Sequence, residues 1–439
     1  MAVSAGDHTA CRGRIAAEEA KAAQEAEHTA CRGRIIIGEE AAVLEGKTVV
    51  LGVTGSIAAY KIANLASALV KLGAGVRVIM TRNAANFITP TTFETLTGNR
   101  CLIDTFDRNF EFDVQHIALA KQADVVLIAP ASADIIGKIA HGIADDMLTT
   151  TVMACRCPKL IAPAMNTAMY ENPIVQDNLR MLEYYGWQVI DPAVGHLACG
   201  DTGSGKMPEP EQLLQWIERE IACTKDLAGK KVLVTAGPTQ EAIDPVRYIT
   251  NHSSGKMGYA LAHAAMLRGA DVTLVSGQTA LAPVPFVKNI SIVSAGEMFE
   301  AVTSVSAEAD IILKAAAVAD YRPAEVSDEK IKKSDDAMRI DLERTPDILG
   351  YLGAHKRPGQ FLCGFSMETS NVISNSRAKL DRKNLDMIAA NSLREAGAGF
   401  RGDTNVLTLI TRDQEVSLPL MSKEDAAMKI LDYIMEMTQ

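Results

Sequence analysis

The sequence Lys159-Leu-Ile-Ala-Pro-Ala-Met-Asn-Thr-Ala-Met-Tyr170 passes from a short apolar run through a proline to an amide side chain. The run Leu160–Ala162 predicts the end of a buried strand, and Pro163 predicts the turn that follows. Asn166 would then stand past the carboxyl end of a strand, where ligands bind in open α/β sheets. Its amide can donate to and accept from a substrate carboxylate. The same Asn could instead cap the next helix, so this pattern alone leaves both interpretations open.

The region before this segment has the pattern of a β-α-β unit with a glycine at its first turn. Strands are predicted at Thr48–Val53 and Val76–Met80, with Gly55 and Ser56 between the first strand and a helix. Such a turn leaves backbone N–H groups at a helix N-terminus free to bind a phosphate, and Ser56 adds a hydroxyl. There is no G-x-G-x-x-G here, so a mononucleotide such as FMN fits better than a dinucleotide.

Alternating strands and helices continue through most of the chain. Further strands are expected at residues 124–129, 188–190, 272–276 and 310–314. In addition, a strand is expected to run into a glycine turn within residues 232–239, and another strand is expected to end within residues 361–369. This alternation predicts an α/β fold with two tandem Rossmann-like, doubly wound parallel sheets, because 439 residues exceed what one core usually holds. We expect three parts: an extension at residues 1–45, a first domain at 46–225 and a second domain at 226–439.

The start of the chain contains a duplicated segment. Asp7-His-Thr-Ala-Cys-Arg-Gly-Arg-Ile15 returns as Glu27-His-Thr-Ala-Cys-Arg-Gly-Arg-Ile35. Two copies are too few for a solenoid, so a loosely ordered extension is the prediction. A redox or metal-binding role for the Cys-His repeats is the alternative, which unchanged activity and assembly after deletion of residues 1–40 would remove.

Composition excludes several classes of function. The net charge of −10 argues against nucleic acid as the main partner. No apolar run reaches the roughly 18 residues needed to span a bilayer, and the polar start is unlike a signal peptide, so a cytoplasmic protein without membrane contact is expected. Eight scattered cysteines indicate reduced thiols, and the close pair Cys155 and Cys157 has no second pair at zinc-site spacing.

Three residue types in the first domain suit carbanion chemistry beside a flavin. His116 can take or give a proton near neutral pH, and Cys199, in a glycine-dense loop, can protonate a carbanion. Asn166 is the third. Taken singly, the imidazole could be a core histidine and the thiol a buried apolar group.

The second domain carries phosphate-friendly features of its own. Asn251–Gly258 leads into a helix, although Thr250 stands where a P-loop needs its first glycine. Lysines gather at Lys330–Lys333, and Lys379 and Lys383 share one helix face. Together they could neutralise a triphosphate, with solvated surface lysines as the alternative.

Two sets of motifs resemble known enzyme families. Gly55–Lys61, Gln115–Leu119, Pro163–Asn166 and Ala198–Asp201 resemble the flavin-containing cysteine decarboxylases. Ala236–Thr239, Asp244–Ile249, Asn251–Gly258, Ala316–Tyr321 and Lys330–Lys333 resemble phosphopantothenate–cysteine ligase. In this order, over residues 46 to 437, the chain is similar to the bifunctional coenzyme A biosynthesis proteins of bacteria.

The resemblance implies a ligase reaction in the second domain. CTP would activate the carboxylate of 4′-phosphopantothenate as an acyl-cytidylate, and the amine of cysteine would displace CMP. Asn251 would help to hold the acyl-cytidylate, and Mg²⁺ would bridge the phosphates, with no residues assigned to the metal. The implied CTP-binding residues are Asp320, Lys330, Pro346, Asp347, Ile348, Leu349, Phe365, Lys379 and Lys383.

For the first domain, a flavodoxin-like flavoprotein, the resemblance implies FMN-dependent decarboxylation of 4′-phosphopantothenoylcysteine to 4′-phosphopantetheine. His116 would assist oxidation of the cysteine moiety, Asn166 would orient the substrate carboxylate, and Cys199 would protonate the ene-thiolate after CO₂ is lost. The net reaction is non-redox. The FMN-binding residues are expected at Gly55, Ser56, Thr81, Ser132 and Met165.

Small departures from the family pattern remove no proposed catalytic group. Gln115 stands where Gly is usual, Asp145-Asp146 where Asn-Asp is frequent, and Tyr170 where several relatives carry Trp. The resemblance also implies a homo-oligomer, in which trimeric decarboxylase units, with FMN between subunits, are joined through ligase dimers, a dodecamer being one such assembly.

Two rival functions are considered. One is a non-enzymatic flavoprotein that acts as a regulatory or interaction subunit, which would be expected to lack one of the three catalytic groups that this chain retains. The other is a nicotinamide-dependent dehydrogenase, which the missing dinucleotide fingerprint disfavours.

Overall fold

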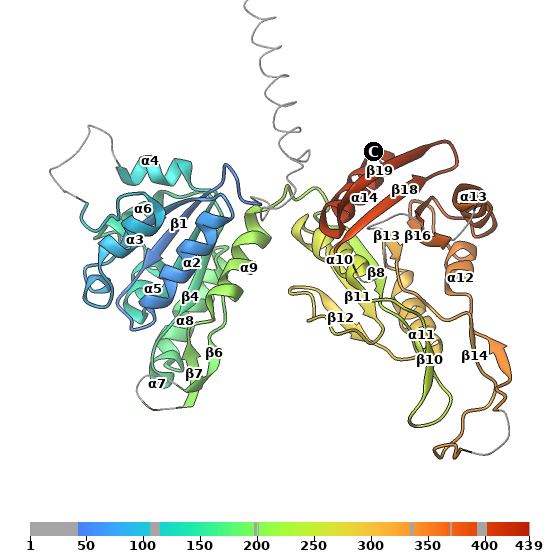
Figure 1. Ribbon diagram of the computed structural model, residues 1–439. Coiled ribbons are helices and arrows are strands. Elements are labelled where there is room, and N and C mark those ends of the chain that lie inside the picture. Colours follow the sequence, from blue (N-terminus) through green and yellow to red (C-terminus); the bar gives the residue numbers. More distant parts are fainter. Residues whose placement is uncertain are drawn as a thin grey trace, which may run out of the picture. The chain divides into compact units, whose positions relative to one another are not determined.

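The computed structural model describes most of the chain after its first 42 residues (Figure 1). The described residues are 43–105, 115–196, 200, 202–333, 338–368, 371–392 and 402–438. The duplicated segments of the start and Cys199 therefore lie outside the described residues. Within the described residues, no helix is long and apolar enough to cross a membrane.

The first sheet consists of five parallel strands in the order β2-β1-β3-β4-β5. The strands are β1 (Thr48–Val53), β2 (Gly75–Met80), β3 (Val125–Ala131), β4 (Lys159–Pro163) and β5 (Gln188–Val189). The predicted parallel sheet is confirmed. In chain order this is the flavodoxin-like arrangement 2-1-3-4-5, which reverses direction between β1 and β3.

Helices cover both faces of this sheet (Figure 1). They are α2 (Ala59–Lys71), α3 (Pro90–Thr97), α4 (Gln115–Gln122), α5 (Ala133–Ala140), α6 (Met147–Ala154), α8 (Pro173–Tyr184) and α9 (Pro210–Ile221). One core joins the sheet to α2 and α9 through buried Ile62, Leu65 and Ile217. A second core joins the other face to α5 and α8, as at Ile135 and Leu179. Burial of each such side chain stabilises the fold by roughly 1.5–3 kcal/mol. Because helices cover both faces of the sheet, β3 is apolar throughout and β1 is apolar after Thr48.

The second sheet has eight strands in the order β12-β11-β8-β13-β16-β17-β18-β19. Its strands are β8 (Lys231–Ala236), β11 (Asp271–Ser276), β12 (Lys288–Ser291), β13 (Ile311–Lys314), β16 (Phe361–Glu368), β17 (Met387–Ser392), β18 (Thr404–Ile410) and β19 (Glu415–Ser422). The first six strands in chain order follow the Rossmann arrangement 3-2-1-4-5-6, so the predicted fold class is confirmed here too. The structure adds an antiparallel hairpin, β18–β19, at the β17 edge.

Helices again cover both faces. They are α10 (Lys256–Leu267), α11 (Ala295–Ser306), α12 (Ile348–Ala354), α13 (Val372–Arg382) and α14 (Lys423–Thr438). Leu261 of α10 and Ile430 of α14 belong to the core on one face, and Met298 of α11 and Leu380 of α13 belong to the core on the other. The carboxyl edge of the sheet is left for the connecting loops.

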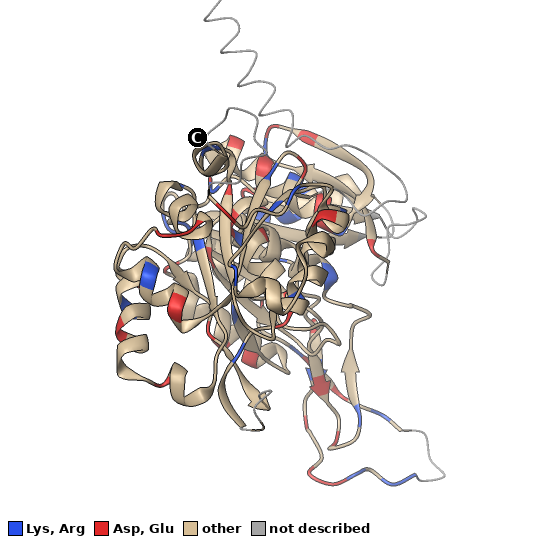
Figure 2. Cartoon of the chain, turned by 90° about the vertical axis from the view of Figure 1, so that its left-hand side faces the viewer, with Lys and Arg blue, Asp and Glu red and all other residues tan. Residues whose placement is uncertain are grey.

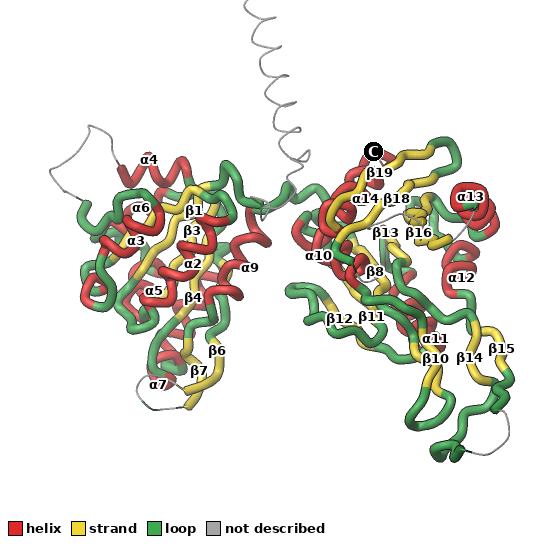
Figure 3. Tube along the Cα trace, viewed as in Figure 1, coloured by secondary structure: helices red, strands yellow, loops and turns green. Residues whose placement is uncertain are grey.

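Three small hairpins extend from these carboxyl edges (Figure 3). They are β6 (Ala193–His196) with β7 (Thr202–Lys206), β9 (Gln240–Ala242) with β10 (Tyr248–Thr250), and β14 (Tyr321–Pro323) with β15 (Leu342–Arg344). Each hairpin belongs to a segment with predicted site residues.

Several element boundaries differ from the sequence-based expectation. Pro163 is the last residue of β4 rather than part of the turn after it. The helix after Ser132 ends at Ala140, because Gly142 has a φ of 69°, which a right-handed helix cannot accommodate. Asn166 caps a short helix, α7 (Thr167–Tyr170), that precedes α8.

Candidate active sites

The predicted flavin residues all follow strand ends at one edge of the first sheet. Gly55 and Ser56 come after β1, Thr81 directly after β2, Ser132 directly after β3 and Met165 after β4. Because the carboxyl ends of parallel strands meet at one edge, the fold gathers these residues around the point where the strand order reverses.

The turn after β1 is shaped by close packing. A Cβ on Gly55 would lie 2.7 Å from Cβ of Asn83, so only glycine fits beside the loop after β2. No described side chain caps α2, whose N-cap is Ala58. The first N–H groups of this helix therefore remain suited to an anion.

The ends of β1 and β3 are tied together beside this turn. Thr54 Oγ1 donates to the carbonyl oxygen of Pro130 at 2.6 Å and accepts from the N–H of Ser132 at 3.0 Å. Thr54 is 1% exposed. This pair of bonds holds Ser132, the N-cap of α5, next to the glycine turn.

Asn166 is held by both its own helix and the β6–β7 hairpin. Its Oδ1 accepts from the N–H of Ala168 at 2.8 Å, so the capping interpretation is confirmed. The N–H of Met165 donates to the carbonyl oxygen of Gly205 in β7 at 3.1 Å, and a Cβ on Gly205 would lie only 2.3 Å from Met165 O. The hairpin therefore packs directly on the Asn166 loop. Cys199 falls between β6 and β7 in the sequence but outside the described residues.

His116 lies away from Asn166 within the part of the chain that forms the first sheet. It is half-buried in the first turn of α4, which packs through Leu119 into the core on one face of the sheet. In Figure 1, α4 and α7 lie at opposite ends of this unit. One chain thus does not bring His116 beside Asn166.

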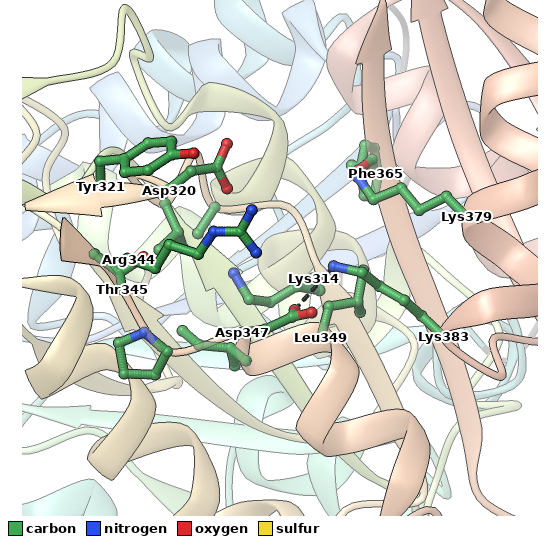
Figure 4. Close-up of a pocket in the computed structure, with 14 residues that line it drawn as sticks. Lys314, Asp320, Tyr321, Arg344, Thr345, Asp347, Leu349, Phe365, Lys379 and Lys383 are labelled. Atoms are coloured by element: carbon green, nitrogen blue, oxygen red, sulfur yellow. Dashed lines mark hydrogen bonds and ion pairs between the residues drawn. The ribbon is translucent and has the colours of Figure 1, made fainter. Parts of the chain in front are cut away.

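In the part of the chain that forms the second sheet, the carboxyl ends of β13 and β16 border a cavity of about 410 Å³ (Figure 4). Eight of the nine residues predicted to bind CTP line it: Asp320, Pro346, Asp347, Ile348, Leu349, Phe365, Lys379 and Lys383. They come from the segment after β13, from the start of α12, from β16 and from α13 with its C-cap. Residues up to 63 positions apart in the sequence therefore share one cavity.

Two of the lysines are fixed by neighbours. Lys383 Nζ donates to Asp347 Oδ1 at 2.8 Å, and Lys379 Nζ donates to the carbonyl oxygen of Phe365 at 3.3 Å. Asp347 also caps α12 by accepting from the N–H of Gly350 at 2.9 Å. Burial opposes ionisation of Asp347, but Lys383 and Gly350 outweigh it and lower its pKa. The carboxylate is therefore ionised at neutral pH and orients Lys383.

Lys330 is the ninth predicted residue and does not line this cavity. It is exposed on the segment between β14 and β15, along which Figure 2 shows acidic positions followed by basic ones. This segment is held by Asp244, which accepts from the N–H of Ile331 at 3.1 Å and from Arg247 Nε at 2.9 Å. Burial opposes ionisation of Asp244, but these bonds and those from backbone N–H groups lower its pKa to about 2.

Sequence reasoning assigned no role to several cavity residues. They are Lys314, Tyr321, Arg344 and Thr345. Lys314 is the last residue of β13 and is 7% exposed. Burial, with help from Lys379 and Lys383, lowers its pKa to about 7. The sequence contained one signal for a site role of Lys314: it is a charged residue that ends the apolar run Ile311–Leu313, at the carboxyl end of a strand, where ligands bind.

Asn251 borders a second, smaller hollow of about 240 Å³. Its Nδ2 donates to the carbonyl oxygens of Ala317 at 3.2 Å and Val318 at 3.1 Å, on the segment that follows β13. Val318 also lines the large cavity. Asn251 therefore joins the loop before α10 to the border of the large cavity.

These features define the class of protein. The first sheet carries an anion-ready glycine turn at its reversal point, and the second carries a basic cavity at its carboxyl edge. The chain is thus a nucleotide-binding α/β enzyme with two separate candidate sites.

Comparison with known proteins gives the family. Residues 37–222 match the Flavoprotein family, and residues 227–437 match the DNA/pantothenate metabolism flavoprotein C-terminal domain. The chain is 47% identical over 396 residues to the coenzyme A biosynthesis bifunctional protein CoaBC of Bacillus subtilis (strain 168), covering 89% of this chain and 97% of that protein. With the CoaBC protein of Vibrio cholerae serotype O1 it shares 48% identity over 395 residues, covering 90% and 99%.

A solved structure of the C-terminal domain of a CoaBC protein is 44% identical and covers 49% of this chain and 98% of its own, with a TM-score of 0.42. The chain belongs to the family of coenzyme A biosynthesis bifunctional proteins. It is a bifunctional enzyme of coenzyme A biosynthesis with a flavoprotein decarboxylase part and a ligase part. The relatives give no support to a non-enzymatic regulatory flavoprotein.

Proposed function

We propose that this chain joins 4′-phosphopantothenate to cysteine with CTP and then decarboxylates the product to 4′-phosphopantetheine. The observation that carries the ligase half is the cavity of the second sheet, where basic side chains meet at strand ends. We assign residues 226–439 to the ligase and 46–225 to the decarboxylase, which acts in the cytoplasm on small-molecule substrates.

In the ligase, the basic residues bind the phosphates of CTP and Phe365 offers a ring face for the base. Asn251, at the hollow beside this cavity, holds the acyl-cytidylate while the amine of cysteine displaces CMP. We also assign Lys330, on the segment between β14 and β15, to CTP binding. Charge on the departing pyrophosphate is stabilised by Lys379 and Lys383.

Mg²⁺ fits the composition of this cavity. The carboxylates of Asp320 and Asp347 both line it. Magnesium is usually held by one or two carboxylates together with substrate phosphates. These residues would hold the ion on the phosphates of CTP, where it neutralises charge.

FMN fits the edge of the first sheet, where the uncapped start of α2 offers N–H groups to its phosphate. Bound FMN supplies reversible hydride acceptance, which allows a decarboxylation with no net redox change. Asn166 orients the substrate carboxylate, His116 moves a proton during oxidation, and Cys199 returns a proton to carbon after CO₂ leaves.

His116 and Asn166 reach one substrate only if two chains contribute. Since α4 and α7 lie at opposite ends of the unit, we place each decarboxylase site between neighbouring chains of a homo-oligomer. We propose that this part forms trimers, which are linked through ligase dimers.

The direct test supplies 4′-phosphopantothenate, cysteine and CTP to the purified protein. The expected products are CMP, pyrophosphate, CO₂ and 4′-phosphopantetheine. The purified protein should also show the absorbance band of bound flavin at about 450 nm. Use of ATP but not CTP would overturn the assigned nucleotide. A protein without flavin that makes only 4′-phosphopantothenoylcysteine would overturn the decarboxylase half.

A further inference from the structure

Lys314 is a buried amine that forms no ion pair with any residue the structure describes. It ends β13, between Thr235 of β8 and Gly364 of β16 in the sheet register, and only 7% of it is exposed. Its Nζ lies 3.9 Å from the sulfur of Met298, and among the described residues it forms no ion pair. Burying an ammonium without a partner is costly, so such an arrangement requires an explanation.

The amine faces the large cavity. Figure 4 shows Lys314, Arg344 and Lys383 directed into the same space. Four basic side chains line this cavity against two acidic ones, and the carboxylate of Asp347 is already engaged by Lys383. Among the described residues Lys314 has no ion-pair partner, and an anion that enters the cavity would supply one.

We propose that Lys314 is a further nucleotide-binding residue of the ligase site, whose buried ammonium is paired by the phosphate groups of bound CTP. This inference rests on the proposed function, since it takes CTP as the occupant. It adds a contact from the floor of the cavity, between the sheet and the lysines of α13. Because the position is on a rigid strand rather than a loop, the amine is placed before the nucleotide arrives.

Proton uptake on binding follows from the surroundings of Lys314. Without a ligand, burial and the nearby Lys379 and Lys383 lower its pKa to about 7, while Asp347 acts in the opposite direction. Arg344 and Asp320 also line the cavity. A polyphosphate favours the charged amine, so binding raises the pKa of Lys314. The stabilising contact is complete below about pH 7 and is lost as pH rises through the higher pKa of the complex.

The test is calorimetric titration of the full-length protein with Mg²⁺–CTP at pH 8, in MOPS and in Tris. These buffers have different protonation enthalpies, so the apparent binding enthalpy reports the protons exchanged. For the unaltered protein we expect an uptake that approaches one proton per CTP and an affinity that falls between pH 7 and pH 9.

Lys314→Met keeps the length of the side chain and removes its amine. It should weaken CTP binding about 10- to 100-fold and abolish most of the proton uptake, because a charged hydrogen bond is lost. Lys288→Met, which removes an exposed lysine at the start of β12, is the matched control and should change neither quantity.

The outcomes separate the two proposals. If the unaltered protein binds CTP and Lys314→Met binds it equally, with the same uptake, the role of Lys314 is overturned while the proposed function stands. If no nucleoside triphosphate binds, both fail. Should Lys314→Met not fold, the pH series on the unaltered protein decides, and an affinity independent of pH from 7 to 9 would overturn the inference.

Discussion

At the scale of single residues, Asn166 has a capping role that the structure shows and a substrate role that we propose. Its Oδ1 accepts from the N–H of Ala168 at 2.8 Å, which fixes the orientation of the amide. The backbone N–H of the preceding Met165 donates to Gly205 of the β6–β7 hairpin, which holds the Asn166 loop in place. A fixed amide at a strand end is better prepared to bind a carboxylate than a mobile one.

We predict that Asn166→Asp separates these two roles. Asp caps a helix about as well as Asn, so the melting temperature should stay within a few degrees. Decarboxylation of supplied 4′-phosphopantothenoylcysteine should fall roughly 100-fold, because a carboxylate would face the substrate carboxylate. Asn172, which caps α8 through the N–H of Ile174 at 3.0 Å, provides the control Asn172→Asp. Equal activities of the two variants would exclude the substrate role.

A second residue-scale prediction concerns Asn251. In Asn251→Asp the donor to Ala317 and Val318 becomes a carboxylate that faces two carbonyl oxygens. Release of CMP from 4′-phosphopantothenate, cysteine and CTP should drop about 10- to 100-fold, since two hydrogen bonds are lost and the loop shifts. Decarboxylation of supplied 4′-phosphopantothenoylcysteine should not change. Loss of both activities together would contradict two separate sites.

The predictability of single residues depended on what surrounds them. Lys379 and Lys383 could be predicted because helical spacing puts both on one face, and both line the cavity. Lys330 does not line the cavity, because hydrogen bonds with Asp244 hold its segment. These bonds are tertiary contacts, which no local sequence pattern reveals. Lys314 was not predicted because a lysine after an apolar run looks like the end of a strand, and its burial depends on tertiary contacts such as that with Met298 of α11.

At the scale of elements, hydrogen bonds join the β9–β10 hairpin to the segment between β14 and β15. Asp244 is 2% exposed and accepts from the N–H of Val246 and of Ile331, and Arg247 donates to the carbonyl oxygen of Ile331 at 2.7 Å. This single carboxylate connects two extensions of the sheet. The position of Lys330 thus depends on its ionisation.

We therefore predict that Asp244→Asn loosens residues 324–333. At pH 7 their amide hydrogen exchange should be roughly tenfold faster or more, because the acceptor for Arg247 and Ile331 loses its charge. In the unaltered protein the pKa of Asp244 is about 2, below the unfolded value of about 3.9, so its stabilising effect is present above about pH 4 and is lost as pH falls toward 2.

The control for this prediction is Asp328→Asn, which removes an exposed carboxylate from the same segment. Exchange in this variant should match that of the unaltered protein. If Asp328→Asn loosened the segment as much as Asp244→Asn, net charge rather than the Asp244 bonds would account for its order.

Elements were predictable where local pattern and tertiary position agree. The strands at β1, β3 and β13 were expected to within two residues at either end, since each consists mainly of a continuous apolar run covered on both faces. The β18–β19 hairpin was not assigned, although β18 alternates buried and half-buried residues as an antiparallel strand should. The alternation of earlier strands and helices does not indicate which edge of the sheet this hairpin joins, so its pairing with β17 could not be predicted.

At the scale of the whole molecule, both sheets use the same structural principle. Each places its candidate ligand-binding groups at the carboxyl edge near a reversal of strand order, between β1 and β3 in the first sheet and between β8 and β13 in the second. The two edges nevertheless differ in chemistry: the first offers backbone N–H groups, and the second gathers side-chain cations. A compact, singly esterified phosphate suits the former and a polyphosphate suits the latter.

If the two sites are chemically separate, variants that each lack one of them should complement each other in a mixture. Asn251→Asp retains decarboxylation and Asn166→Asp retains ligation, so each alone should convert less than about a tenth of 4′-phosphopantothenate to 4′-phosphopantetheine. An equimolar mixture should recover a large share of the unaltered rate, because 4′-phosphopantothenoylcysteine made by one chain can reach the intact site of another. Product release is followed by thiol labelling and mass spectrometry over time. A mixture no more active than the sum of its parts would show that the intermediate does not leave the chain that makes it, and would require a direct passage between the sites.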